Sequence, residues 1–197
     1  SVRATLLSKV SVWASRTSLV ANRILENQAG GKGGGLFSTF ALVEQNRIAR
    51  NLSISGGGVF AETNSSLTGN IITENECSGA AGGGVVLNFW GMSIKNEVFA
   101  ENSVTQNTAA GDSPVGGVYL NGAMIFSRNN IFKNTGIQLF NANSASDPPL
   151  KAESCYWGTT SEAEINNAVY DGTDDPSLAK VAFKPFASHP FEIEAVE

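Results

Sequence analysis

The sequence has few of the residues on which most enzymes and nucleic-acid-binding proteins depend. Among 197 residues it has one histidine, His189, and two cysteines, and only 16% of its residues are charged. A single imidazole excludes most chemistries that use histidine as a base or metal ligand, and two cysteines cannot make a disulfide-rich scaffold. The net charge of −5 gives no attraction for nucleic acid. We therefore expect no nucleic-acid partner. No apolar run is long enough to cross a bilayer, so we also expect no membrane span.

Glycine and asparagine, in contrast, are abundant, with 21 glycines and 19 asparagines. Both residues favour turns, and so much asparagine is unusual for a helical domain. Because 42% of the residues are hydrophobic, the chain has enough apolar surface to form a core. We therefore expect one folded domain rather than a disordered chain.

An internal repeat accounts for many of the asparagines. The pattern apolar-x-x-Asn-x-Ile/Val-x-x-Asn occurs five times. Its first asparagines are Asn22, Asn46, Asn70, Asn102 and Asn129, and its second asparagines are Asn27, Asn51, Asn75, Asn107 and Asn134. We predict that all ten are structural and form hydrogen-bonded ladders between equivalent corners of successive repeats.

A glycine cluster follows each repeat and opens a run of alternating apolar residues, so each repeat supplies three short β-runs separated by turns. This unit of about 24 residues predicts an all-β protein, namely a parallel β-helix with three sheets and about six rungs. Residues 1–146 are expected to form the repeats, with an enlarged rung or loop near 88–95. Residues 147–197 are expected to form the last rung and a C-terminal cap. In this cap, Ser161-Glu-Ala-Glu164 is a capping box that predicts a short helix through about Tyr170.

The alternation after the glycine clusters assigns residues to the inner and outer faces of the strands. Three inward columns are predicted: Leu36, Val59, Val85, Val118 and Ile137; then Ala61, Leu87, Leu120 and Leu139; and, from the asparagine repeats, Ile24, Ile48, Ile72, Val104 and Ile131. The intervening residues are predicted to point outward: Phe37, Phe60, Val86, Tyr119 and Gln138, with Thr39, Glu62, Asn88, Asn121 and Phe140 as their outer neighbours.

These repeats resemble those of the right-handed parallel β-helix proteins of the pectin-lyase-like superfamily, over nearly the whole chain. The Gly-Gly-Gly-Val and Phe-x-x-Asn pieces are also similar to repeats of polymorphic outer-membrane autotransporter passengers. The ending, with Cys155-Tyr-Trp-Gly158 and Phe183-Lys-Pro-Phe186, is similar to the terminal segment of many bacterial secreted or surface proteins, which often have Asn where Cys155 stands here. The resemblance implies a right-handed coil and a secreted or cell-surface location. It implies no activity, because one superfamily includes lyases, hydrolases, adhesins and phage spikes.

The candidate ligand-binding residues are the outward aromatics Phe37, Phe60 and Tyr119, extended by Phe89 and Trp90 of the predicted loop. Aromatic groups repeated on successive rungs form a platform that can stack on sugar rings or receive another protein chain. The alternative is that a terminal segment, Phe183 to Phe191, folds back and covers this face.

Two further groups of residues have defined chemistry. Asp171, Asp174 and Asp175 offer oxygen ligands to Ca²⁺, the only cofactor that the sequence suggests, although Asx turns explain the same cluster equally well. Cys77 and Cys155 lie about three rungs apart, too far for a disulfide, so we expect two free thiols.

We assign no catalytic residues. Hydrolases of this superfamily use clustered Asp residues with a His, and lyases use acidic Ca²⁺ ligands with an Arg or Lys base. The nearest constellation is Glu74 and Glu76 beside Arg47 and Arg50, for which exposed ion pairing is the simpler explanation. The sequence therefore favours a non-catalytic extracellular module for recognition or structure, with carbohydrate as a candidate ligand. The alternative is a polysaccharide lyase or glycoside hydrolase.

The start of the chain suggests one more partner. Ser1 is followed at once by repeat-like sequence, which is compatible with a fragment of a longer helix. An open strand edge at that end would invite self-association with another copy of the chain.

Overall fold

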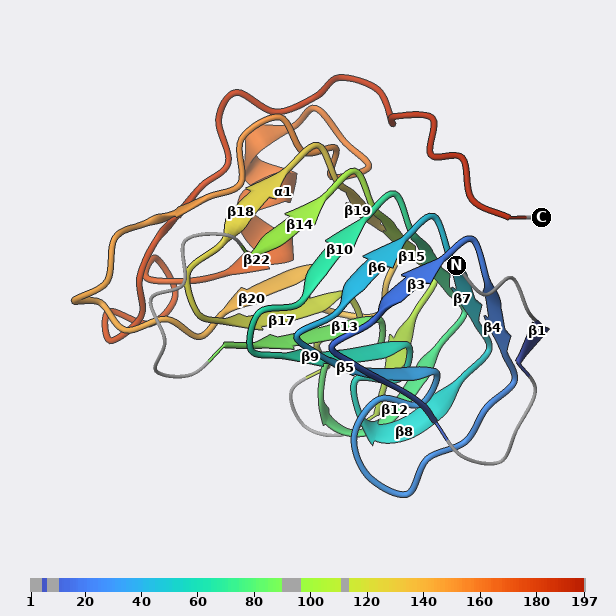
Figure 1. Cartoon of the computed structure of the whole chain (residues 1–197). Coiled ribbons are helices and arrows are strands. Elements are labelled where there is room, and N and C mark those ends of the chain that lie inside the picture. The colour runs from blue at the N-terminus through green and yellow to red at the C-terminus, as the bar shows by residue number, and fades with distance from the viewer. Residues whose placement is uncertain (1–4, 7–10, 90–96, 111–113, 197) are drawn as a thin grey trace.

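The computed structural model shows a parallel β-solenoid of about five turns, with one short helix near the C-terminus (Figure 1). It describes residues 5–6, 11–89, 97–110 and 114–196. The strands of successive turns pair in parallel, as β6 (Leu42–Glu44) with β10 (Ser66–Thr68) and β7 (Arg47–Ala49) with β11 (Ile71–Thr73) do in the middle of the rod. The all-β solenoid predicted from the repeats is therefore confirmed.

Four sheets run along the solenoid. Sheet A contains β1 (Thr5–Leu6), β4 (Arg23–Leu25), β7 (Arg47–Ala49), β11 (Ile71–Thr73), β15 (Ser103–Thr105) and β19 (Asn130–Phe132). Sheet B contains β2 (Val12–Ser15), β5 (Leu36–Thr39), β9 (Val59–Glu62), β13 (Val85–Asn88), β17 (Val118–Asn121), β20 (Leu139–Asn141) and β22 (Val169–Tyr170). Sheet C contains β3 (Ser18–Val20), β6 (Leu42–Glu44), β10 (Ser66–Thr68), β14 (Val98–Ala100) and β18 (Ile125–Ser127). Sheet D contains β8 (Leu52–Ser55), β12 (Glu76–Ala81) and β16 (Thr108–Ala109).

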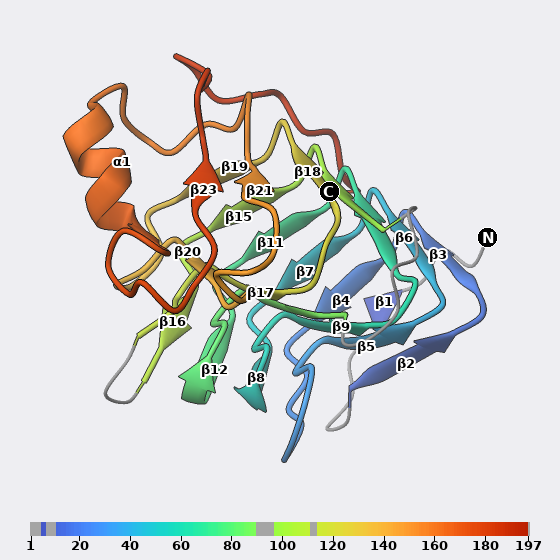
Figure 2. The ribbon, with the colours of Figure 1, turned by 90° about the vertical axis from the view of Figure 1, so that its left-hand side faces the viewer.

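One turn of the chain passes through sheets C, A, D and B in that order, as β6, β7, β8 and β9 show. Sheets C, A and B correspond to the three β-runs that the repeat predicts. Sheet D is an addition, and it lies between the second asparagine of a repeat and the glycine cluster. Figure 2 shows its strands at one side of the solenoid.

Two asparagine ladders run along the corners on either side of sheet A. In the first ladder, the side-chain oxygen of Asn46 accepts hydrogen bonds from the backbone N of Asn22 at 2.8 Å and from its Nδ2 at 3.0 Å. In the second ladder, Asn51 accepts the same two bonds from Asn27, at 2.9 and 3.0 Å. The pattern continues through both columns, so the structural role predicted for all ten asparagines is confirmed. These bonds satisfy polar groups inside the rod that would otherwise be costly to bury.

Every ladder asparagine follows a residue in the left-handed region of backbone space. Gln45, before Asn46, has a φ of 53°, and Arg50, before Asn51, has a φ of 56°. Single residues in this conformation turn the chain sharply between strands only three residues long. Glycine stands at just one of these ten positions, Gly69. The other nine corners hold a non-glycine residue in a strained backbone conformation, which the ladders must stabilise.

The glycine clusters allow neighbouring turns to approach backbone to backbone. A Cβ atom on Gly57 would lie 2.4 Å from the carbonyl oxygen of Glu76, and one on Gly58 would lie 2.6 Å from that of Gly84 and 2.8 Å from Nδ2 of Asn75. No side chain fits in that space. The clusters therefore serve the close packing of successive turns.

The inward columns are confirmed for most of the rod. Leu36, Val59, Val85 and Val118 lie in register on sheet B, and the isoleucines of sheet A stack as predicted. The last turn departs from the prediction by two residues: Val118 pairs with Leu139 instead of Ile137, and Leu120 pairs with Asn141 instead of Leu139.

The outward assignment of Gln138 was wrong for the same reason, whereas Phe140 points outward as predicted but in the neighbouring column. The Gln138 side chain is buried, where it hydrogen-bonds to the last asparagine of the second ladder. Strand β20 therefore starts at Leu139, and Phe140 takes the outward position predicted for Gln138.

The segment after the last repeat contributes Leu150, Cys155, Ile165 and Val181 to the main hydrophobic core. The predicted helix is present as α1 (Glu162–Ala168), with the Ser161 side chain accepting from the backbone N of Glu164. Strands β21 (Leu150–Lys151) and β23 (Val181–Ala182) pair beyond it. Figure 1 shows the C-terminal segment running back along the solenoid towards its N-terminal end. Within the described part of the chain, no helix has the length and apolar character to cross a membrane.

Candidate functional site

The outer face of sheet B has one column of large side chains, which we call the aromatic column. Register places its members on seven adjacent strands. They are Trp13, Phe37, Phe60, Val86, Tyr119, Phe140 and Tyr170. Sequence analysis identified three of the six aromatic members. In all six cases a β-branched residue or leucine directly precedes the aromatic residue. This pattern can also be recognised in strands that no glycine cluster precedes.

The rings of the aromatic column form two face-to-face stacks, one from Trp13 to Phe60 and one from Tyr119 to Tyr170, with Val86 between them. Trp13 and Phe37 have ring centroids 4.7 Å apart, and Phe140 and Tyr170 are 4.9 Å apart with an interplanar angle of 5°. Tyr119 stacks on Phe140 at 5.3 Å and 9°. Because the ring faces are used within the column, the interior rings present their edges outward. A free ring face is to be expected only at the ends of a stack.

The middle of the aromatic column is covered. Phe37 is 9% exposed and Phe60 is 4% exposed, so the prediction of an open platform through these residues was wrong. The cover comes from Ala81 of sheet D and from Lys32, whose Nζ lies 4.5 Å from the Phe60 ring centroid and 2.7 Å from Glu62 Oε1.

The terminal segment does not provide this cover. Phe183 belongs to the main core, and Phe191 exchanges backbone hydrogen bonds of 2.8 and 2.9 Å with the side chain of Asn130 on sheet A. Of the two predicted loop residues, Phe89 is also in the main core, and Trp90 lies outside the described residues.

Trp13, which sequence analysis missed, is the most accessible member of the column. It is 74% exposed although one side of its ring packs on Phe37. A polar column lies beside it on the same face of sheet B: Ser15, Thr39, Glu62, Asn88 and Asn121. Aromatic and hydrogen-bonding groups thus occur side by side on this surface.

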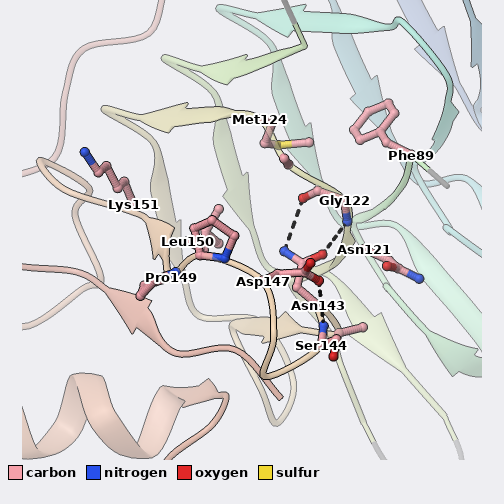
Figure 3. Close-up of a pocket in the computed structure, with 13 residues that line it drawn as sticks. Phe89, Asn121, Gly122, Met124, Asn143, Ser144, Asp147, Pro149, Leu150 and Lys151 are labelled. Carbon is pink, nitrogen blue, oxygen red and sulfur yellow. Dashed lines mark hydrogen bonds between the residues drawn. The ribbon is translucent and has the colours of Figure 1, made fainter. Parts of the chain in front are cut away.

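A pocket of about 650 Å³ opens where β17 and β20 end (Figure 3). Its walls come from Phe89, the turn 121–124, and the segments 142–144 and 147–151. Neither the repeat pattern nor any motif pointed to it, because most of these residues lie in the turns and the cap, where the repeat is lost.

The aspartates proposed as Ca²⁺ ligands bind backbone amides instead. Asp171 is buried, and its two carboxylate oxygens accept from Thr173 N at 2.7 Å and Val181 N at 2.5 Å. Asp174 accepts from Asp171 N, and a hydrogen bond from Ser177 N lowers the pKa of Asp175. In the regions that the structure describes, no three His, Cys, Asp or Glu residues are grouped to hold a metal ion. The geometry is that of Asx turns.

The charged constellation is an exposed ion-pair cluster. Arg50 lies 2.8 Å from Glu26 and 3.8 Å from Glu74, and the hydrogen bond with Glu26 raises the pKa of Arg50. Neither Arg47 nor Glu76 takes part in an ion pair between described residues. Exposed pairs of this kind contribute little to stability.

Both cysteines are buried free thiols, as predicted. Cys155 continues the first asparagine ladder, with its sulfur 3.9 Å from Nδ2 of Asn129. Burial raises the pKa of Cys155 to about 11, and burial also raises the pKa of Cys77. Neither thiol is suited to act as a nucleophile near neutral pH.

No family model, curated protein or solved structure matches the chain. What is established is therefore the parallel solenoid with its asparagine ladders, a fold that by itself specifies no activity.

Proposed function

We propose that this chain is a non-catalytic recognition module of a secreted or cell-surface protein, related to the pectin-lyase-like β-helices, and that it binds carbohydrate on the outer face of sheet B. The observation that carries the proposal is the exposure of Trp13, 74%, in a side chain held in place by stacking on Phe37. Of the rings that sequence analysis nominated, Phe37 and Phe60 are excluded as contacts because they are covered.

An indole ring fixed in this way is suited to stack on the apolar face of a sugar. Burying a large apolar side chain against a partner stabilises a complex by about 1.5 to 3 kcal/mol, and an ordered ring loses little entropy on binding. The neighbouring Ser15 and Thr39 supply hydroxyl groups at the spacing of adjacent strands, which suits the repeated hydroxyl groups of a glycan.

Nothing in the described residues favours the enzyme alternative. Hydrolysis or elimination needs an acid and a base held near the same bond. The acidic residues in the best candidate clusters bind either a neighbouring arginine or backbone amides.

A glycan array tests the proposal with wild-type protein and the Trp13→Ala variant. We expect the wild type to bind a defined set of glycans and Trp13→Ala to lose at least about tenfold in affinity at an unchanged melting temperature. Ile54→Ala, which removes an exposed side chain from sheet D, is the matched control and should bind as the wild type does. Absence of glycan binding by the wild type, or full binding by Trp13→Ala, would contradict the proposal.

A further inference from the structure

We infer that the pocket at the ends of β17 and β20 is a second binding site, specific for a small, uncharged aromatic molecule. It is separate from Trp13, which lies at the opposite end of sheet B, four strands from β17. The inference therefore does not depend on carbohydrate binding.

The walls of the pocket are mainly apolar. Phe89 and Met124 lie on one side, and Pro149 and Leu150 lie on the other (Figure 3). Phe89 and Leu150 are each 5% exposed, so an aromatic ligand would contact mainly the partly buried Met124, and methionine sulfur makes favourable contacts with aromatic rings. A volume of about 650 Å³ is within the range of sites that hold small molecules.

The pocket is pre-formed rather than a gap between loose loops. Asn143 is buried, and its side chain accepts from Gly122 N at 2.6 Å and donates to Gly122 O at 3.2 Å. Gly122 has a φ of 132°, and a Cβ atom there would lie 2.7 Å from that of Phe89. Leu150 is held by the pairing of β21 with β23. A rigid site loses less conformational entropy when a ligand binds.

The polar groups define the class of ligand. Lys151 extends away from the pocket in Figure 3, and the Asp147 carboxylate accepts a hydrogen bond from Ser144 N at 3.0 Å. Both charges are exposed and of opposite sign, so the site has no preference for a net charge. Asn143 and Asp147 already hydrogen-bond to backbone groups of the pocket wall, and unpaired sugar hydroxyl groups in a mainly apolar pocket are costly. An aromatic ring with at most one or two polar groups fits better.

The test uses N-phenyl-1-naphthylamine, a neutral aromatic dye that fluoresces in apolar surroundings. We expect saturable binding of one dye per chain. Ala123→Trp places a large group in the pocket from an exposed position, and we expect it to weaken binding at least about tenfold. Ala163→Trp makes the same change at an exposed site on α1 and should leave binding unchanged.

A site-specific readout identifies where the dye binds. In protein labelled with ¹³C at the methionine methyl groups, the Met124 signal, assigned with Met124→Leu, should shift on dye addition because of the ring current. No saturable binding, equal affinity in the two tryptophan variants, or an unmoved Met124 signal would each overturn the inference. Trp13→Ala should not change dye affinity, so this test and the glycan test can fail separately.

Discussion

The amide oxygen of Gln138 ends the second asparagine ladder by accepting two hydrogen bonds from Asn134, one from its backbone N at 3.0 Å and one from its Nδ2 at 2.9 Å. The Gln138 amide nitrogen in turn donates to the carbonyl oxygens of Asn134 and Gly136. A glutamine from the following strand connection thus replaces the asparagine of a next turn. Without it, the buried backbone N of Asn134 would lose its acceptor, and Nδ2 would keep only the carbonyl oxygens of Val104 and Phe132.

Gln138→Ala should lower the free energy of unfolding by about 1 to 3 kcal/mol, because it leaves the buried backbone N of Asn134 unpaired and removes one acceptor of its Nδ2. Chemical denaturation followed by circular dichroism measures this. Gln106→Ala is the matched control, since Gln106 is an exposed corner glutamine, and it should change stability by less than about 0.5 kcal/mol. Equal effects of the two substitutions would show that Gln138 does not close the ladder.

Two glycine substitutions should separate backbone strain from steric exclusion. Gly69→Ala meets nothing closer than 3.5 Å but keeps a φ of 63°, so we expect a loss of about 1 kcal/mol. Gly57→Ala forces a Cβ to within 2.4 Å of a backbone oxygen, and we expect a loss of about 3 kcal/mol or more. Thermal unfolding of both variants gives the comparison, and a Gly69→Ala variant as unstable as Gly57→Ala would contradict it.

Glu97→Gln should become more stable relative to the wild type as the pH rises. Burial raises the pKa of Glu97 above its usual value of 4.5, although the carboxylate accepts a hydrogen bond from Asn64 N. The folded state therefore holds this proton more tightly than the unfolded state. The stability that the Glu97 proton contributes to the wild type is fully present below pH 4.5, and it is lost as the pH rises through the pKa of Glu97 in the folded state.

Melting temperatures of the wild type and Glu97→Gln from pH 3.5 to pH 7.5 check this dependence. Glu101→Gln, at an exposed carboxylate paired with Arg128, provides the control. A difference between the wild type and Glu97→Gln that stays constant with pH would refute the role assigned to burial.

Neither thiol should react with Ellman's reagent in the folded protein at pH 8, and two should react after denaturation. Both sulfur atoms are buried, and the pKa of Cys155, at about 11, keeps it protonated at that pH. The Cys77→Ala variant assigns any residual reactivity. One rapidly reacting thiol in the native wild type would be inconsistent with this structure.

The sequence was informative wherever one turn constrains the next. The spacing from Asn22 to Asn46 repeats because each asparagine must meet its partner, and the strands between them must then lie in register. This rule predicted the ladders and most of the inward columns. It failed at Gln138, because a polar side chain that closes a ladder resembles an outward residue of a strand.

The candidate sites were harder to predict because they depend on contacts between elements that do not repeat. Phe60 has the pattern of an outward aromatic, but Lys32 and Ala81 cover it from a sheet that the repeat did not reveal. The exposure of Trp13 and the pocket beside Met124 likewise depend on contacts that the repeat does not specify.

The direction of the hydrogen bonds also determines how this molecule responds to force. The strand pairs and both asparagine ladders bond along the rod, whereas the strands run across it. Tension applied between the two ends therefore pulls these bonds apart one turn at a time rather than shearing them together. Successive ladder asparagines are 24 to 32 residues apart, so each rupture releases about 80 to 110 Å of extended chain. We therefore expect the solenoid to lengthen in discrete steps under tension.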